Sequence, residues 1–481
     1  MLFNSYIFIF AFLPAAVIGY YLLAKVNRLL PEVYLLLMSL CFYGYFNPAY
    51  LLIICGSIVG NYLISGILSR KQDKLILVLG IVANTAVIFY FKYFNFIKET
   101  INGIFHLDLM ITDIVLPLGI SFFTFQQISF LVDSYKGECK DYSFVEYALF
   151  VSFFPQLIAG PIVLHRETIP QFRDPLRKKV DFDNIYSGIV LFTLGLAKKV
   201  ILADTFARCV TWAFDGNVDT LTSPEIFIIM LSYTFQIYFD FSAYSDMACG
   251  IGRIFNIAIP MNFNSPYKSY SIPEFWGRWH MTLGRFLKEY IYIPLGGSRK
   301  GQARTYRNIM LIFLVSGIWH GANWTFILWG ILHGVANCLT RVFRKQYDRM
   351  HMAFQWFITF AYVSILWLLF RADSIRQWVR LLLRMFKMET FTVRKEIIDS
   401  FSLPERGFVF DLFHLRGLAG KIPFICPLLF FAFAFVVCLN HRNSVEKKFH
   451  ANVLTTVFTA LLLAYAVISV GGVSVFIYFN F

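Results

Sequence analysis

The sequence predicts an all-α protein that crosses a membrane many times, and three features of its 481 residues support this class. Hydrophobic residues make up 58% of the chain and charged residues only 15%, whereas a soluble domain carries about 25% charged residues. Apolar runs of about 20 residues, the length that a spanning helix needs, recur from end to end. Aromatic residues reach 19%, which suits aromatic belts at two membrane surfaces. A soluble fold of this length could not bury so much apolar surface, so lipid must surround much of the chain.

The apolar runs define the expected transmembrane helices in order along the chain. The first begins at the N-terminus without a basic segment before it or a small-residue cleavage site after it, so we expect it to be retained. The run at 308–340 is too long for one simple span. The runs, about eleven in number, are 5–24, 32–47, 49–68, 75–93, 113–132, 184–203, 224–248, 308–340, 354–370, 423–439 and 452–478.

The segment 144–164 is apolar but is expected to form a re-entrant element. Basic residues flank it on both sides, and one membrane crossing cannot place both flanks in the cytoplasm. Pro155, Gly160 and Pro161 would also interrupt a helix there. Irregular backbone at membrane depth is tolerated only where protein or a cavity surrounds it, so this segment is a candidate lining of a pore.

The basic residues predict the orientation of the chain. They gather in short loops, at Lys25 and Arg28, at 70–74 and at 341–349, which we expect to face the cytoplasm. This loop pattern explains the net charge of +14 better than nucleic-acid binding does. The long stretch 371–422 is basic and contains no apolar run, and we expect it to be an extracytoplasmic loop. No internal repeat or separable soluble domain is present, so residues 1–481 are expected to form one membrane domain.

Neither a metal site nor a disulfide framework is predicted. The eight cysteines are scattered singly, most of them within apolar runs, and none forms a CxxC pair. The histidines at 280, 320 and 333 lack ligand-type spacing, and no H-E-x-x-H motif occurs. No Walker-type phosphate loop is present either.

His320 is the first candidate for chemistry. It lies in the string FLVSGIWHGANWTFILWG, where Gly317 and Gly321 bracket Trp319 and His320 and allow the apolar helix to break. An ionisable side chain inside a membrane segment is costly, so it is a functional hypothesis by default. The alternative is a core histidine that donates to a neighbouring carbonyl.

His280 is the second candidate. In FWGRWHMTLGRFLKEYIYIPLGG, a continuous helix would place Trp276, His280 and Leu283 on one apolar face, with Arg278, Arg285 and Lys288 opposite. That pattern predicts an amphipathic interfacial helix whose basic side meets headgroups or solvent. The basic side could also attract the phosphates of a coenzyme A-like donor, and an incidental histidine is the alternative for His280.

A third group of polar residues interrupts the run YTFQIYFDFSAYSDMACG. It contains Asp240, Ser242 and Asp246, and two carboxylates in one membrane helix need partners or water. A Ser–His–Asp hydrolase is conceivable, but no G-x-S-x-G elbow accompanies these serines. A structural polar network is the favoured interpretation of this group.

Four strings occur in a fixed order along the chain: FFPQLIAGPIVLHRE (153–167), YTFQIYFDFSAYSDMACGIGRIF (233–255), NFNSPYKSYSIPEFWGRWHMTLGRFLKEYIYIPLGG (262–297) and LVSGIWHGANWTFILWGILHG (314–334). Together they resemble the membrane-bound O-acyltransferase (MBOAT) family, and most closely its bacterial alginate O-acetylation branch. The closing string FIYFNF (476–481) is similar too. Ser298 and Gly277 depart from the expected pattern, where asparagine and a basic residue would stand, so the resemblance does not name the acceptor polymer.

The resemblance implies a fold and a site. The fold is a ring of membrane helices around a thinned core, with a catalytic core at 115–340, N-terminal helices at 1–114 and C-terminal helices at 341–481. His320 matches the family's catalytic histidine, and His280 matches a second histidine that is important in the bacterial branch. The residues expected to bind substrate are Trp319, Asn323, Trp276, Arg278, Gln156, Asp240 and Ser242.

The expected reaction is acyl transfer from a cytoplasmic thioester, such as acetyl-CoA, to a hydroxyl. His320 would act as general base, and no cofactor is expected to be bound permanently. The acceptor would be an exported polysaccharide or an extracytoplasmic SGNH-type acetyltransferase, and the location would be the bacterial inner membrane. Three alternatives stay open: D-alanyl transfer to teichoic acid, a polysaccharide or lipid transporter, and a structural scaffold. A transporter should show inverted repeats, which the sequence lacks.

Overall fold

The computed structural model describes residues 1–112, 114–139, 141–388, 390–403, 411, 424–440, 443–470 and 476–477, and every regular element in these ranges is a helix. Short π-helical turns continue several helices: η1 (Phe8–Phe12) precedes α1, η2 (Phe89–Tyr93) joins α4 to α5, η3 (Lys198–Ala203) joins α10 to α11, and η6 (Lys288–Tyr292) follows α14. The first helices are α1 (Leu13–Ala24), α2 (Leu30–Gly44), α3 (Tyr50–Lys71), α4 (Lys74–Ile88), α5 (Phe94–Phe105), α6 (Ile120–Tyr135), α7 (Phe144–Ser152), α8 (Phe154–Leu157), α9 (His165–Arg173), α10 (Phe182–Ala197) and α11 (Asp204–Phe214).

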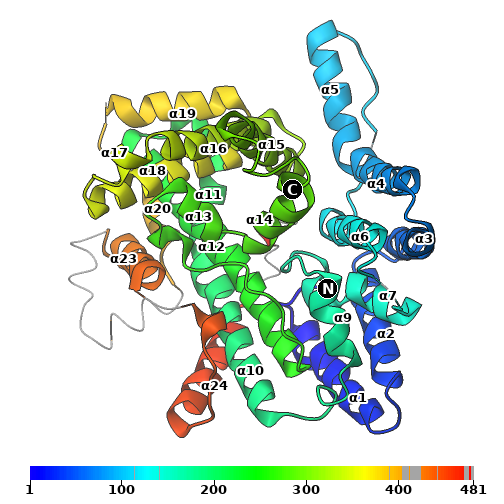
Figure 1. Ribbon diagram of the computed structural model, residues 1–481. Coiled ribbons are helices and arrows are strands. Elements are labelled where there is room, and N and C mark those ends of the chain that lie inside the picture. Colours follow the sequence, from blue (N-terminus) through cyan, green and yellow to red (C-terminus); the bar gives the residue numbers. More distant parts are fainter. Residues whose placement is uncertain are drawn as a thin grey trace.

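The remaining helices complete a two-part arrangement (Figure 1). The blue and cyan helices α1–α9 form one part, the green and yellow helices α13–α19 form the other, and α10 and α12 run between them. The remaining helices are α12 (Ser223–Ile254), α13 (Ile272–Arg278), α14 (Met281–Leu287), α15 (Gln302–His320), α16 (Trp324–Val342), α17 (Arg344–Tyr347), α18 (Met352–Arg371), α19 (Ile375–Lys387), α20 (Lys395–Asp399), α23 (Ile425–Asn440) and α24 (Val453–Ile468).

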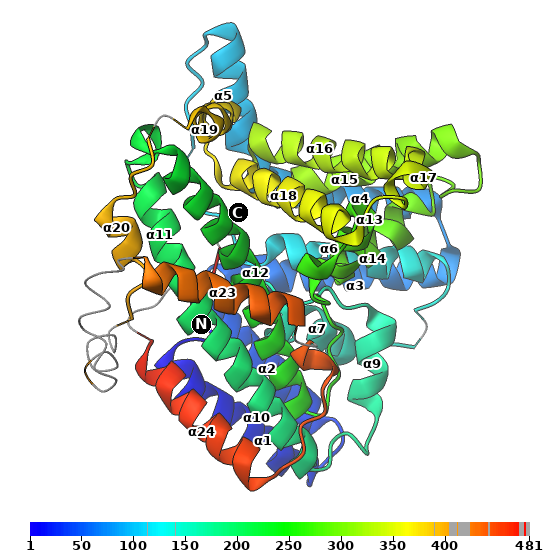
Figure 2. The ribbon, with the colours of Figure 1, turned by 90° about the vertical axis from the view of Figure 1, so that its left-hand side faces the viewer.

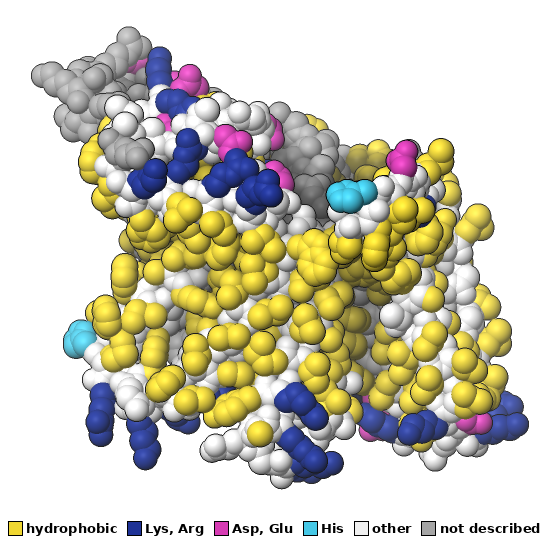
Figure 3. Space-filling model, turned by 90° about the horizontal axis from the view of Figure 1, so that it is seen from above, with side chains coloured by type: hydrophobic (Ala, Val, Ile, Leu, Met, Phe, Trp, Pro, Cys, Tyr) yellow, Lys and Arg dark blue, Asp and Glu magenta, His cyan; other side chains and the backbone are white. Residues whose placement is uncertain are grey.

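The protein is a membrane protein, but the count of eleven spans is not confirmed. Six helices in the described ranges are long and apolar enough to cross a bilayer, and four further apolar helices are shorter. A broad hydrophobic band separates two rims that carry charged side chains (Figure 3). The six are Tyr50–Lys71, Lys74–Phe105, Phe182–Phe214, Ser223–Ile254, Trp324–Val342 and Met352–Arg371, and the four are Phe8–Ala24, Leu30–Gly44, Ile425–Asn440 and Val453–Ile468.

The two charged rims lie at opposite ends of the molecule (Figure 2). Helices α9 and α17 lie at one end of the molecule, which we call the α17 face, and α19 and α20 lie at the other, the α19 face. The C-terminal end of α6 lies on the same side of the molecule as the end of α3 that carries Arg70 and Lys71. The hydroxyl of Ser69 donates to the carbonyl of Cys139, just beyond α6. The N-terminal end of α6 therefore points away from those basic residues.

The segment 144–164 returns to its starting side, as a re-entrant path requires. Helices α7 and α8 are followed by non-helical backbone, and the residues from 146 to 165 are buried. The two ends meet, because the ring of His165 contacts the hydroxyl of Tyr142 at 3.3 Å and Arg173 pairs with Glu146.

The long apolar run 308–340 divides into α15 and α16, as its glycines predicted. The two helices pack side by side (Figure 2). A Cβ atom on Gly317 would lie 2.4 Å from the carbonyl oxygen of Phe326, and one on Gly330 would lie 2.4 Å from that of Phe313. Only glycine allows this approach of the two backbones, and the approach fixes the end of α15 that carries His320.

The expected loop 371–422 is partly helical. Helix α19 buries Leu381 and Met385 and presents its arginines outwards, so it is an amphipathic helix at the α19 face. Helix α20 follows it. Residues 404–410 and 412–422 lie outside the described residues.

Candidate active site

His320 ends helix α15 inside the protein. The next residue, Gly321, has extended backbone (φ −168°), so the helix stops and the imidazole stays buried with 4% of its surface exposed. Aromatic rings surround it: the ring centroids of Trp319, Trp329 and Phe370 lie 5.0, 5.1 and 5.3 Å away. The apolar wall favours the neutral imidazole, which is the form that can accept a proton.

His280 does not lie on a continuous amphipathic helix, so that prediction is wrong. The chain breaks between α13 and α14, and His280 adopts left-handed backbone with φ +46°. A buried polar contact stabilises the break: Nδ1 of His280 lies 3.1 Å from Oδ1 of Asn262, which also accepts a hydrogen bond from the Thr282 hydroxyl at 2.9 Å. Because an amide oxygen only accepts, His280 donates through Nδ1 and its Nε2 carries the lone pair.

The indole of Trp319 contacts both histidines. Its centroid lies 5.0 Å from that of His320 and 6.0 Å from that of His280. Phe125 stacks on the same indole at 5.4 Å, and Phe122 contacts it edge-on at 5.3 Å. His280 and His320, 40 positions apart in sequence, thus share one aromatic wall.

A small cavity of about 40 Å³ adjoins His320. It is lined by Lys92 from η2 and by the residues that lead into α6, including Gly119. Gly119 has φ +71°, and a Cβ there would lie 2.7 Å from the carbonyl oxygen of Leu157, so this turn requires glycine. The cavity lies at the end of α6 that points away from Lys71.

A larger cavity of about 340 Å³ adjoins His280. Its lining includes Ser316 from α15, Arg341 from α16 and Lys288 from η6. Arg341 lies 17 residues beyond Trp324, so it stands roughly 25 Å along α16 from the end near His320. The two cavities therefore approach the histidines from different directions: the small one is lined by Lys92, and the larger one by Lys288 and Arg341.

The expected substrate-binding residues do not all lie at the site. Trp319 and Trp276 lie at the site: Trp276 lines the larger cavity, and its Nε1–H donates to Nδ1 of His333 at 3.2 Å. Arg278 is held by Glu274 at 3.0 Å and by the carbonyl of Asn264, so its charge is already paired.

Asn323 and Gln156 form hydrogen bonds with backbone groups around the site. Asn323 begins α16, where its Oδ1 accepts the N–H of Thr325 at 3.0 Å and its amide donates to the carbonyl of Asp373. Gln156 in α8 is buried, and its amide donates to the carbonyl of Phe150 at 2.9 Å.

Asp240 lies in a separate polar cluster inside the membrane core. Its carboxylate receives the ammonium of Lys199 at 2.6 Å and the backbone N–H of Ile477 at 2.8 Å. The next side chain, Phe241, contacts His280 with ring centroids 4.8 Å apart. Asp240 is thus tied to η3 and the C-terminal segment, and Ser242 is buried on the same helix.

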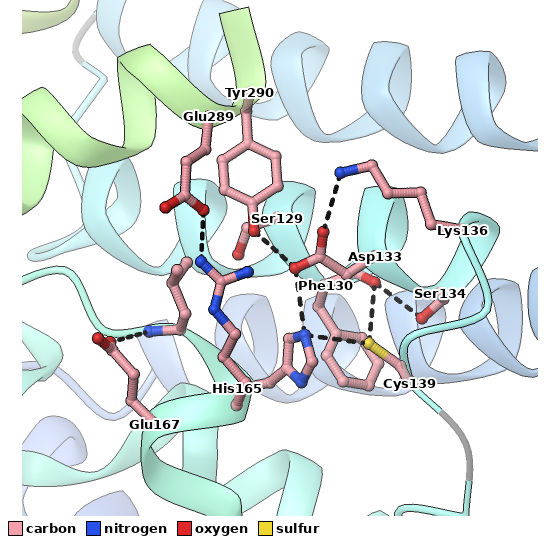
Figure 4. A network of polar contacts seen from close by, with 12 residues as sticks. Ser129, Phe130, Asp133, Ser134, Lys136, Cys139, His165, Glu167, Glu289 and Tyr290 are labelled. Atoms are coloured by element: carbon pink, nitrogen blue, oxygen red, sulfur yellow. Dashed lines mark hydrogen bonds and ion pairs between the residues drawn. The ribbon is translucent and has the colours of Figure 1, made fainter. Parts of the chain in front are cut away.

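Another buried histidine, His165, lies in a network of polar contacts between α6, α9 and η6 (Figure 4). Nε2 of His165 is 3.1 Å from Oδ2 of Asp133, which also accepts the hydroxyl of Tyr290 at 2.6 Å. Lys136 lies 3.5 Å from the other carboxylate oxygen. The sulfur of Cys139 is 3.3 Å from the His165 ring, and burial raises the pKa of this thiol to about 12, so it stays protonated.

Sequence reasoning missed Lys92, Asn262 and Phe122. Lys92 did leave a signal, because it is a lone cation within the expected span 75–93. Asn262 and Phe122 left none, since their roles depend on contacts with segments far along the chain. Within the described part of the chain, no three His, Cys, Asp or Glu side chains gather as ligands of a metal ion would.

An all-helical membrane protein with an enclosed histidine pair suits group transfer shielded from water, and comparison with known proteins gives the family. Residues 80–372 match the sequence model of the membrane-bound O-acyltransferase family. A peptidoglycan O-acetyltransferase of Helicobacter pylori is 39% identical over 100% of this chain and 98% of its own length. A probable alginate O-acetylase of Pseudomonas aeruginosa is 38% identical over 81% of this chain and 76% of its own. A teichoic acid D-alanyltransferase of Bacillus subtilis is 28% identical over 47% of this chain and 60% of its own.

The chain belongs to the membrane-bound O-acyltransferase family. It is a membrane enzyme that transfers acyl groups, as the resemblance of its four strings predicted.

Proposed function

We propose that this protein transfers an acetyl group from a thioester, such as acetyl-CoA, to the hydroxyl of an exported glycan, with His320 as the general base. The observation that carries the proposal is that the rings of His320 and His280 both pack against Trp319, with one cavity beside each histidine. Two substrates can therefore approach the same buried wall without sharing one route.

The chemistry follows from the groups at the wall. A sugar hydroxyl is a weak nucleophile at neutral pH, and His320 accepts its proton as the oxygen attacks the thioester carbonyl carbon. The carbon–sulfur bond then breaks, and the proton goes to the departing thiolate. General base catalysis supplies about 10²–10⁴-fold of the rate, so positioning along the aromatic wall supplies much of the remainder. His280, with its basic Nε2, orients the donor or handles the second proton.

The donor enters by the larger cavity. Its volume of about 340 Å³ accommodates an extended thioester arm, and Lys288 and Arg341 offer charges to the phosphates of a nucleotide-linked donor. Arg341 belongs to the α17 face, where the positively charged short loops place the cytoplasm. The hydroxyl reaches His320 from the opposite direction. We place the enzyme in the bacterial inner membrane with the α19 face outside.

Peptidoglycan is the first candidate acceptor. The peptidoglycan O-acetyltransferase matches this chain over its full length, whereas the alginate O-acetylase covers 81% of the chain. The acetyl group passes either directly to the glycan or through an extracytoplasmic SGNH-type acetyltransferase. D-alanyl transfer to teichoic acid is the second candidate, supported by a relative that matches about half of the chain.

His320→Ala tests the proposal. In inverted membrane vesicles, which expose the cytoplasmic side, wild-type protein should transfer radiolabel from acetyl-CoA to base-labile esters of the glycan. His320→Ala should lower that rate by at least about 10²-fold with unchanged protein level. The matched control is His450→Ala, because His450 is exposed in the segment before α24. Full ester formation by His320→Ala would refute the assignment, and label from D-alanyl thioester alone would favour the second candidate.

A further inference from the structure

The side chain of Lys92 is bound to the end of the helix that carries His320. Its Nζ donates to the carbonyl oxygen of Trp319 at 2.7 Å and to that of His320 at 3.0 Å. The hydroxyl of the neighbouring Tyr93 donates to the carbonyl of Ile318. The last carbonyls of a helix have no partner within it, and a cation is favoured there. One π-helical turn, η2, thus satisfies three consecutive carbonyls at the end of α15.

The same residue borders the small cavity beside His320. An ammonium has three N–H groups, and two of those of Lys92 are used on α15. Lys92 also lines the cavity of about 40 Å³, which has room for a group the size of a hydroxyl or a water molecule. The first residues of α6, Ile120 and Ser121, line it too, and the N-terminus of a 16-residue helix adds partial positive charge.

This arrangement has a chemical use in the reaction proposed above. When the hydroxyl oxygen bonds to the thioester carbon, the carbonyl π electrons move to the carbonyl oxygen, which becomes an oxyanion before the carbon–sulfur bond breaks. Fixed donors in a water-poor site stabilise such charge strongly, because they need no reorganisation. The hydrogen bonds to α15 hold the Lys92 charge in place before the substrate arrives.

We propose that Lys92 is the residue that stabilises the oxyanion of the acyl-transfer step, an inference that rests on the proposed function of His320. The competing explanation is that Lys92 only closes the end of α15. The two explanations differ in what they require: stabilisation of the oxyanion requires the positive charge, whereas closing the helix requires only an N–H donor.

Lys92→Gln and Lys92→Met separate these explanations. Both remove the charge, but only glutamine keeps N–H donors for the carbonyls of Trp319 and His320. We expect kcat to fall by about 10²–10³-fold in both variants with little change in the KM for the thioester. The unfolding temperature in detergent should fall in Lys92→Met and stay near the wild-type value in Lys92→Gln.

The matched control is Lys98→Gln. Lys98 lies in the same continuous helix and also donates twice, to the carbonyl of Met110 and the hydroxyl of Thr112, both at 2.9 Å, but it does not line the cavity. It should keep the wild-type kcat.

Two results would overturn the inference. One is a wild-type kcat in Lys92→Gln, and the other is a kcat loss in both variants that only follows the loss of folded protein. Either result would leave the proposed function intact provided that His320→Ala is inactive, whereas an active His320→Ala would remove the proposed function itself.

Discussion

Two buried histidine centres in this protein have opposite surroundings. At the aromatic wall, His320 and His280 are packed against Trp319 and neighbouring rings. Both ring nitrogens of His165 meet polar side chains: Nε2 lies 3.1 Å from Asp133 in the network of Figure 4, and Nδ1 lies 3.3 Å from the hydroxyl of Tyr142. Burial alone therefore does not mark a histidine for chemistry; the groups around it decide.

The physical difference lies in the groups that surround each ring. The carboxylate of Asp133 holds His165, Tyr290 and Lys136 in one network, and removing a member leaves a buried charge with fewer partners. Such a centre stabilises one arrangement of α6, α9 and η6. The rings of Trp319, Trp329 and Phe370 pack around His320 instead. The first centre suits turnover and the second suits rigidity.

The largest expected effect comes from removing one histidine from each centre and comparing stability with transfer rate. His165→Ala should lower the free energy of unfolding by about 2–4 kcal/mol, because Asp133 loses a donor and a cavity remains. Thermal unfolding in detergent would measure it, together with the transfer rate per folded molecule, which should stay within about tenfold of wild type. His320→Ala should instead lower the transfer rate per folded molecule and leave the free energy of unfolding near the wild-type value. A His165→Ala protein that unfolds like wild type but is inactive would show that the network takes part in the transfer reaction. It would contradict the proposed difference between the two centres.

A smaller effect should come from the amide that orients His280. Asn262→Leu removes the acceptor that holds the proton on Nδ1, so the basic Nε2 is no longer fixed, and we expect about a tenfold loss of kcat. Steady-state kinetics in vesicles would measure it. Asn264→Leu is the control, because Asn264 contacts Arg278 through its backbone and should keep the wild-type rate. Equal losses in both variants would attribute the effect to the loop rather than to the tautomer.

The smallest effect concerns Cys139 in the polar network. Burial raises the pKa of this thiol to about 12, above its ordinary value of about 9, so the folded state keeps the proton longer than the unfolded state does. Its contribution to stability is complete below pH 9 and is lost as the pH rises towards 12. Between pH 8 and 9.5, wild type should therefore lose about 1 kcal/mol relative to Cys139→Ala. Parallel stability curves would show a thiol with an ordinary pKa, and a rate loss in Cys139→Ala would show that the thiol serves transfer.

The fold class and the position of His320 were predictable because both depend on local pattern. Apolar runs of membrane length identify helices without reference to their neighbours. Gly317 and Gly321 interrupt such a run beside Trp319 and His320, and the helix does end there. The number of spans was less predictable, since 184–203 belongs to a continuous helix that reaches Phe214 and 144–164 turns back within the protein.

His280 shows where local pattern fails. Its neighbours have helical periodicity, yet the chain breaks at φ +46° because Asn262, 18 residues earlier, supplies a buried acceptor that outweighs the missing helical bonds. The expected substrate-binding set has the same limit. Asp240 looks available in sequence, but Lys199 and the N–H of Ile477 already occupy its carboxylate.

The sequence by itself determined that this chain is a many-helix membrane enzyme of the O-acyltransferase family with a histidine at a broken helix end. Only the tertiary structure placed Lys92 on the carbonyl of His320, 228 residues away, and packed the rings of two histidines against Trp319. The physical reason is that periodicity and hydropathy report how each segment meets its surroundings. Which donor meets which acceptor is decided when segments far apart in the chain pack together and every buried polar group must find a partner.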